Sequence, residues 1–292
     1  MFKETYRRIQ ELGSGAYGSA YKVQRRDDPQ IVHASKEIRL GHMNHRECET
    51  ARVEADLLRK LSHPNIIGYV GVFLEEQRLY IIMEFADKGD LSKKIRARRE
   101  GQKPFTERRI SLVVSQIAGA LDYIHAHKVL HRDLKPLNIF LTKEDDVKLG
   151  DFGIACVLDG DSAVAHTQIG TPHYLSPEVL NREAYGTKSD WWSLGVVTYE
   201  LAALRVPFHA QSLPAVGLAI LRASPAPLPE CYSTALGDLV ARLLEKSPAA
   251  RAGGREVRAH AVLRHHQDAP ERRQSEGGPP EVRAHAVLRH HQ

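Results

Sequence analysis

The sequence predicts an α+β fold in two lobes: a small, β-rich N-terminal lobe with one main helix, and a larger, mostly helical C-terminal lobe. Three observations predict it. Short runs rich in β-branched and aromatic residues occur up to about residue 85, separated by Gly, Asp and Pro. After Gly89, apolar residues recur at helical spacing. Residues 191–204 are apolar on nearly every face, which is typical of a helix at a domain centre.

The N-terminal lobe is predicted over residues 5–85. One helix is predicted within it, over residues 46–61, because Val53, Leu57, Leu58 and Leu61 share one stripe. The string His63-Pro64-Asn65 ends that helix. The candidate strands alternate with turn residues and lie at 6–9, 20–23, 31–34 and 79–83.

The composition changes near residues 84–89, which are predicted to be a hinge between the lobes. The C-terminal lobe is predicted over residues 90–267. Its clearest helix has an apolar stripe that begins at Ile110, and Thr106 is the candidate N-cap residue. A hinge between two lobes is a common place for a ligand to bind.

The end of the chain contains a repeat. Residues 256–267 recur without change at 281–292. The first copy is predicted to be the last helix of the large lobe. Residues 268–280, rich in Gly, Pro and charge, are predicted to be a disordered linker. The second copy has no predicted place to pack, so a recent duplication or a cloning scar is favoured over a function.

Composition excludes several classes of protein. Of the 292 residues, 42% are hydrophobic and 26% charged, which is ordinary for a globular protein, and no apolar run reaches the length of a membrane span. The N-terminus lacks a signal-peptide core. The 3 cysteines are scattered, which favours a reducing, intracellular compartment. The net charge of +5 is attributed to a solvated basic face, so a nucleic-acid partner is not expected.

Residues Gly13 to Gly18 fit the pattern G-x-G-x-x-G, in which backbone N–H groups can approach phosphate oxygens closely. The pattern also occurs in Rossmann folds, where a helix begins at the third glycine. Residues 19–23 instead continue as a strand, which favours a hairpin folded over phosphates.

Lys36 ends an apolar-rich run that begins at Val32. Most lysines lie at the surface, so a phosphate-binding role needs a carboxylate partner on the following helix. Glu54 is preferred to Glu47 and Glu49 by its register on the predicted helix.

The string from His131 to Asn138, followed by Asp151-Phe152-Gly153, carries the most chemistry. It provides a candidate base, Asp133, and a candidate phosphate-contacting lysine, Lys135. Asn138 and Asp151 provide the hard oxygen ligands that Mg²⁺ prefers. The full string with this spacing is not expected by chance.

These motifs, with Gly170 to Glu178 downstream, resemble those of eukaryotic protein kinases, and a lysine at position 135 resembles the serine/threonine kinases. The resemblance extends to NIMA-related serine/threonine kinases and covers about residues 5–267. The sequence stretches that carry this resemblance are residues 80–85, 88–91, 138–142, 149–155 and 169–178.

The resemblance implies a protein kinase fold and an enzyme that transfers the γ-phosphoryl of ATP, with Mg²⁺, to Ser/Thr hydroxyls of protein substrates. It implies Asp133 and Lys135 as catalytic residues, with a Lys36–Glu54 ion pair. Ala34 would form the roof and Phe140 the floor of an adenine pocket. The implied ATP-binding residues are Leu12, Gly13, Ser14, Gly15, Ala16, Tyr17, Gly18, Ala20, Ala34, Lys36, Met83, Glu84, Ala86, Asp90 and Phe140. Met83 would lie at the gate, with Glu84 and Ala86 offering backbone hydrogen bonds.

The resemblance also implies regulation. Thr167, four residues before Thr171, matches an activating phosphorylation site whose phosphate would pair with Arg132. Glu178 would pair with Arg251, although Ala252 follows where the family usually has proline. Asp190 would brace the loop that contains Asp133.

One alternative stays open, a catalytically weak pseudokinase that acts as a binding scaffold. The sequence after residue 267 has no sustained heptads, so coiled-coil dimerisation is not expected and the oligomeric state is open. The resemblance implies a cytoplasmic location with cytoskeletal, centrosomal or ciliary association.

Overall fold

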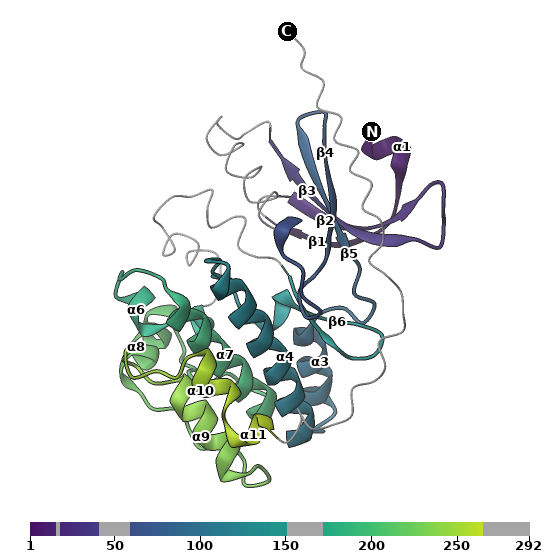
Figure 1. Cartoon of the computed structure of the whole chain (residues 1–292). Helices are drawn as coiled ribbons and strands as arrows, with labels where there is room; N and C mark the ends of the chain where they lie inside the picture. Colours follow the sequence, from purple (N-terminus) through teal and green to yellow (C-terminus); the bar gives the residue numbers. More distant parts are fainter. Residues whose placement is uncertain (16–17, 41–58, 151–171, 265–292) are drawn as a thin grey trace.

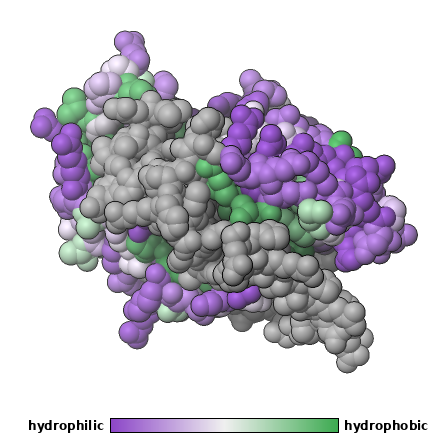
Figure 2. Space-filling model, turned by 90° about the horizontal axis from the view of Figure 1, so that it is seen from above, coloured by the Kyte–Doolittle hydropathy of each residue, from purple (hydrophilic) through white to green (hydrophobic). Residues whose placement is uncertain are grey.

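The computed structural model describes residues 1–15, 18–40, 59–150 and 172–264. Within these ranges the strands of a twisted sheet lie at one end of the molecule and most helices at the other (Figure 1). The predicted α+β class, with a β-rich N-terminal lobe and a helical C-terminal lobe, is therefore confirmed. Figure 2 views the molecule from above, with hydrophilic side chains along the outer edge and a smaller hydrophobic group near the middle.

In the described part of the chain, the N-terminal lobe holds a 5-stranded antiparallel sheet with the order β1-β2-β3-β5-β4. The strands are β1 (Tyr6–Gly15), β2 (Gly18–Arg25), β3 (Val32–Arg39), β4 (Tyr69–Glu75) and β5 (Arg78–Glu84). Each predicted strand overlaps one of these. The prediction missed β4, an edge strand with a glycine, Gly71, in its interior. It also ended β3 too early, since Lys36 lies inside the strand.

The two faces of the sheet bury different clusters. On one face, Val23 and Ile82 pack with the aromatic residues Phe2, Tyr6 and Tyr80. Helix α1 (Phe2–Thr5), which was not predicted, places the Phe2 ring 4.0 Å from that of Tyr80. On the other face Ile38, Leu79 and Ile81 are buried. Of the predicted helix 46–61, residues 46–58 lie outside the described ranges, and residues 59–60 are helical.

The segment between the lobes is held by backbone hydrogen bonds. Lys88 N donates to Leu141 O (3.1 Å), and Leu141 N donates to Gly89 O (2.9 Å). Gly89 has φ +68°, in the left-handed region that glycine adopts without strain. Leu141 ends strand β6 (Ile139–Leu141), which pairs with β7 (Val147–Leu149). The connector thus lies beside the strands that follow the loop containing Asp133.

The C-terminal lobe is built around α7 (Thr187–Ala203), which is buried from Ser189 to Ala202. This confirms the predicted central helix. Thr106 caps α4 (Glu107–Ala126) as predicted, because its hydroxyl accepts a hydrogen bond from Arg109 N at 3.3 Å. The lobe also contains α3 (Leu91–Glu100), α6 (Pro177–Leu180), α8 (Leu213–Arg222) and α9 (Thr234–Leu243). Short 3₁₀ turns span Pro136–Asn138 and Pro172–Tyr174.

The first copy of the repeat packs into this lobe, but not as one helix. It forms part of two short helices, α10 (Gly254–Arg258) and α11 (Ala261–Arg264), which lie near α9 in Figure 1. Ala259 N donates to Arg255 O and ends α10, and His260 N donates to Val257 O. The prediction of a closing helix was therefore right about packing and wrong about continuity. Among the residues described, every helix is too short or too polar to cross a bilayer.

Candidate active site

The loop of residues 131–138 brings three predicted residues into contact. Asn138 Nδ2 donates to both the backbone oxygen and Oδ2 of Asp133, each at 2.8 Å. Lys135 Nζ lies 2.7 Å from the same Oδ2 atom. Asn138 is buried, whereas the side chain of Asp133 is 43% exposed. The carboxylate is therefore fixed from inside the protein and remains open to solvent on its other side.

The backbone of Asn138 is hydrogen-bonded to Gly150, the residue that precedes the second predicted metal ligand in the sequence. Gly150 N donates to Asn138 O at 3.1 Å, and Gly150 directly precedes Asp151. A Cβ atom on Gly150 would lie 2.8 Å from Cε2 of Phe140, so glycine is needed for this close packing. Asp151 itself lies outside the described residues, and its role as a ligand stays a prediction.

The buried carboxylate of Asp190, at the start of α7, anchors the loop of residues 131–138. The backbone N–H groups of His131 and Arg132 each donate to it at 3.0 Å. His125 Nε2 lies 2.7 Å from Oδ2, and the Tyr185 hydroxyl donates to Oδ1 at 2.6 Å. The predicted brace by Asp190 is confirmed. His125 and Tyr185 were not predicted, because a single His or Tyr without a motif carries no sequence signal.

The charge state of Asp190 follows from these contacts. Burial alone would raise the pKa of this carboxyl. The hydrogen bond from His125, the charge of His131 and the hydrogen bond from Tyr185 outweigh burial and lower the pKa. The opposite holds for Tyr185, since burial and the neighbouring Asp190 charge raise the pKa of its hydroxyl. Tyr185 therefore stays a hydrogen-bond donor to an ionised Asp190 at neutral pH.

The predicted nucleotide-binding residues of the sheet lie on adjacent strands. Lys36 on β3 pairs with Ala20 on β2, and Ala34 on β3 pairs with Met83 on β5. Alternate residues of a strand share one face, and directly paired residues lie on the same side. Ala20, Ala34, Lys36 and Met83 are therefore neighbours on one face of the sheet. Glu54, the predicted partner of Lys36, lies outside the described residues, so that ion pair stays a prediction.

The glycine-rich segment is a β-hairpin. Gly13, Ser14 and Gly15 end β1, which pairs antiparallel with β2 from Gly18 onward. This arrangement excludes the Rossmann alternative, in which a helix begins at the third glycine. A Cβ atom at Gly18 would lie 1.8 Å from the Glu37 carbonyl oxygen, so only glycine fits there. Leu12 is 40% exposed. Ala16 and Tyr17 lie outside the described residues.

The connector between the lobes adds contacts that were not predicted. The Glu84 carboxylate accepts a hydrogen bond from Gly68 N at 3.0 Å and lies 2.8 Å from Lys148 Nζ. Sequence reasoning gave Glu84 only a backbone role. Ala86 O accepts a hydrogen bond from Gly89 N at 3.4 Å. The nucleotide-binding roles of both residues stay predictions.

Beyond the connector, Asp90 pairs with Phe140 through an isolated β-bridge. Its carboxylate also accepts a hydrogen bond from Lys93 N at 3.0 Å, which caps α3. The predicted floor residue, Phe140, therefore lies beside the chain that leaves the connector.

Comparison with known proteins identifies the family. A profile of the protein kinase domain matches residues 6–265. The chain belongs to the protein kinase domain family. It is 43% identical over 249 residues, 84% of its length, to the probable serine/threonine-protein kinase nek3 of Dictyostelium discoideum. It is 39% identical over 248 residues, 82% of its length, to the human serine/threonine-protein kinase Nek2. The predicted resemblance to NIMA-related kinases is thus confirmed.

The relatives are longer than this chain. The matched region is 22% of the Dictyostelium protein and 56% of human Nek2. In human Nek5, which is 42% identical over 246 residues, it is 34% of the length. The similarity therefore concerns the kinase domain and leaves most of two of these relatives unmatched.

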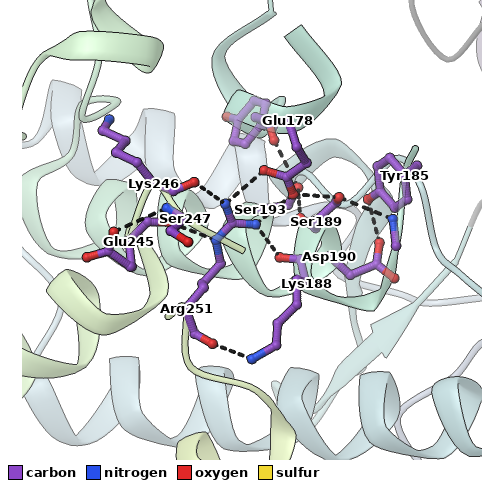
Figure 3. A network of polar contacts seen from close by, with 12 residues as sticks. Glu178, Tyr185, Lys188, Ser189, Asp190, Ser193, Glu245, Lys246, Ser247 and Arg251 are labelled. Atoms are coloured by element: carbon purple, nitrogen blue, oxygen red, sulfur yellow. Dashed lines mark hydrogen bonds and ion pairs between the residues drawn. The ribbon is translucent and has the colours of Figure 1, made fainter. Parts of the chain in front are cut away.

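A second buried polar group surrounds Arg251 and Glu178. Figure 3 shows Arg251 pointing toward Glu178, with Asp190 and Tyr185 at the other end of the group. Arg251 Nη1 and Nη2 donate to the two Glu178 oxygens at 2.7 and 2.8 Å, which confirms the predicted pair. Ser189, next to Asp190, donates to Glu178 Oε1 at 2.8 Å. Ala252, where the family usually has proline, leaves this pair intact.

The predicted regulatory residues are described only in part. Arg132 is exposed and has φ +66°, a left-handed conformation that is uncommon outside glycine. Thr167 and Thr171 lie outside the described residues. The proposed pairing of a Thr167 phosphate with Arg132 is therefore still a prediction.

Proposed function

We propose that this chain is an ATP-dependent protein serine/threonine kinase of the NIMA-related type. It transfers the γ-phosphoryl group of ATP to Ser and Thr hydroxyls of protein substrates. The observation that carries the proposal is the contact of Asp133 with both Asn138 and Lys135. This contact supports roles for Asp133 as the base, Asn138 as a cation ligand and Lys135 as a positive charge beside the transferred group, all within one short loop.

The residues present fit a bound Mg²⁺–nucleotide. Both hydrogen bonds of the Asn138 side chain are made by its amide nitrogen, so the amide oxygen is the branch that would ligate Mg²⁺, together with Asp151. At Gly13, an added Cβ atom would meet nothing within 4 Å, so packing within the protein does not require glycine there. Close approach of a phosphate to the backbone gives a reason for it.

The proposed reaction gives Asp133, Lys135 and Asn138 defined roles. The substrate hydroxyl donates a hydrogen bond to Asp133, which orients its oxygen and accepts its proton as the new O–P bond forms and the bond to ADP breaks. Lys135 moves from Asp133 toward the transferred group and balances its negative charge. Mg²⁺, when bound, neutralises phosphate charge. Asn138 keeps Asp133 in position throughout, because its amide hydrogen bonds do not depend on the substrate.

The choice of Ser and Thr rests on Lys135 and on the relatives, which are named serine/threonine-protein kinases. Phosphoamino-acid analysis of the product tests it. We also propose that phosphorylation of Thr167 activates the enzyme through the exposed Arg132 side chain. If a Thr167→Ala variant retains full turnover, that regulatory proposal is wrong.

Transfer of labelled phosphate from ATP to casein and to a basic protein tests the main proposal. We expect the wild-type chain to label both Ser and Thr, and Asp133→Asn to lower kcat by roughly 10²–10⁴-fold. A matched control is Asp28→Asn, at the exposed turn between β2 and β3, where Asn can still accept the hydrogen bond from Gln30 N. We expect this control to keep wild-type activity.

Nucleotide binding without transfer, in wild-type protein phosphorylated at Thr167, would contradict the proposal and favour the scaffold alternative. Equal activity of Asp133→Asn and wild type would show that Asp133 is not the base. Calorimetric titration with ATP in the presence of Mg²⁺ distinguishes failure to bind from failure to transfer.

A further inference from the structure

Residues 256–264 of the first repeat copy pack against α4 and α9. Val257 and Leu263 are 0% exposed and Val262 is 7% exposed, all within the main core cluster of the C-terminal lobe. We call the surface of α4 and α9 beneath these side chains the tail groove. The tail groove therefore accommodates apolar side chains at three positions of the repeat.

Two polar contacts fix the register of this segment. Arg258 Nε lies 2.5 Å from Asp122 Oδ2 on α4. His260 Nε2 lies 3.0 Å from Asp238 Oδ2 on α9. The two acidic residues flank the apolar contacts, so the groove recognises a basic residue, a histidine and a group of apolar residues in a set order.

The second copy carries every one of these side chains. Val282, Val287 and Leu288 correspond to the buried residues of the first copy. Arg283 and His285 correspond to the residues that contact Asp122 and Asp238. The chain therefore contains two identical segments, both of which carry the side chains that contact the tail groove in the first copy.

We propose that the tail groove is a docking site for residues 281–288, which can replace residues 256–263 of the same chain. The proposal does not rest on the kinase activity. It gives the second copy a binding site. Either copy of the repeat could then form the end of the kinase domain.

The flanking residues favour the first copy. A Cβ atom at Gly254 would lie 1.7 Å from Asp122 Oδ1. The corresponding position before the second copy is Pro279, which has a Cβ atom. Docking of the second copy therefore needs a shift of Asp122 or of the entering chain. This difference explains why the first copy occupies the groove and makes the second a weaker competitor.

The linker is long enough for the exchange. Ala252 N donates to Arg242 O at 3.1 Å, which keeps the chain in place just before the first copy. With the second copy docked, the chain from Ala252 to Glu281 must cover the gap now covered by the few residues from Ala252 to Glu256. That gap is at most about 15 Å, and looping out the intervening residues adds a modest closure cost because this cost grows slowly with length.

A thermal double-mutant cycle in the full-length chain tests the exchange. Leu288→Ala alone should leave the melting midpoint unchanged, because the first copy occupies the tail groove. Leu263→Ala alone should lower the melting midpoint by only a few degrees, because residues 281–288 then dock in the tail groove instead. The melting midpoint of the double variant should be roughly 5 °C lower than that of Leu263→Ala. Additive effects, with the double variant equal to Leu263→Ala, would overturn the proposal.

A charge reversal provides a second, more specific test in the Leu263→Ala background. Asp122→Arg should lower the melting midpoint further, because it repels Arg283. Adding Arg283→Asp should then recover it, whereas adding Arg272→Asp, in the linker, should not. If Arg283→Asp does not restore the melting midpoint, the proposal is wrong. Recovery that depends on protein concentration would also overturn it, since a second molecule would then supply the segment.

Discussion

The guanidinium of Arg251 and the carboxylate of Glu178 form two parallel hydrogen bonds at 2.7 and 2.8 Å, although 73 positions separate them in the chain. Arg251 is 1% exposed and Glu178 5%. Arg251 also donates to the backbone oxygens of Lys188 and Glu245. One buried cation thus joins α6, which contains Glu178, to the start of α7 and to the chain after α9.

Replacing Arg251 with Met should strongly destabilise the fold. The change leaves the Glu178 carboxylate buried without its cation, a loss of about 3–5 kcal/mol in the free energy of unfolding. Urea unfolding followed by circular dichroism measures it. The matched control is Arg242→Met, which removes an exposed pair with Asp238 and should cost at most about 0.5 kcal/mol. Equal losses in the two variants would show that burial of the pair does not matter.

The same pair predicts a pH dependence. Burial would raise the pKa of Glu178, but hydrogen bonds from Arg251 and Ser189 lower it overall from 4.5. A lowered pKa means that the folded state prefers the ionised form, so this stabilisation is complete above pH 4.5 and is lost as the pH falls through the folded pKa. The stability difference between wild type and Glu178→Gln should therefore shrink between pH 6 and about pH 3. A difference that is constant over this range would contradict the lowered pKa.

Replacing two glycines of the β1–β2 hairpin, Gly13 and Gly18, by alanine should affect the stability of the fold differently. Gly18→Ala places a Cβ atom against the Glu37 carbonyl oxygen, so the strand must shift and the free energy of unfolding should fall by about 1–3 kcal/mol. Gly13→Ala meets no protein atom within 4 Å, so stability should not change. If a phosphate approaches this backbone, Gly13→Ala should raise the KM for ATP several-fold.

Unfolding curves and ATP titrations of both variants check this pair. A Gly13→Ala protein with wild-type KM for ATP would show that no ligand approaches the backbone there. A Gly18→Ala protein of wild-type stability would show that β2 and β3 adjust without cost.

The sequence predicted those parts of the site that follow one another at fixed spacing. Asp133, Lys135 and Asn138 lie within six residues, so their mutual contact follows from the loop itself. The Glu178–Arg251 pair and the brace by Asp190 were predicted by resemblance, since nothing in the local pattern joins such distant residues. His125, Tyr185 and Lys148 were missed for that reason, as each acts only through a partner at least five positions away.

The fold was predicted to a similar extent. The apolar run of α7 and the cap at Thr106 were clear, because a buried helix and an N-cap have strong local signals. Strand β4 was missed, since its alternating residues include Gly71 and several exposed apolar side chains such as Val72 and Leu74. At the break between α10 and α11, Arg258 and His260 contact other helices, and such long-range contacts are not contained in the periodicity.

The Tyr185 hydroxyl should influence turnover without touching the substrate. It donates to Asp190 at 2.6 Å, and Asp190 in turn holds the N–H groups of His131 and Arg132, directly before Asp133. Tyr185→Phe removes this donor and keeps the ring. We expect a loss of about 1–2 kcal/mol in stability and a several-fold lower kcat, with an unchanged KM for ATP.

The control for this variant is Tyr232→Phe, which removes a hydroxyl that donates to Phe105 O at 2.8 Å, away from the loop. It should lose a similar amount of stability and keep its kcat. Steady-state kinetics of the two variants, at a temperature where both are fully folded, separates positioning from general destabilisation. If Tyr185→Phe and Tyr232→Phe have the same kcat, the hydroxyl at position 185 supports the fold alone, and the catalytic loop keeps its geometry through the remaining donors to Asp190.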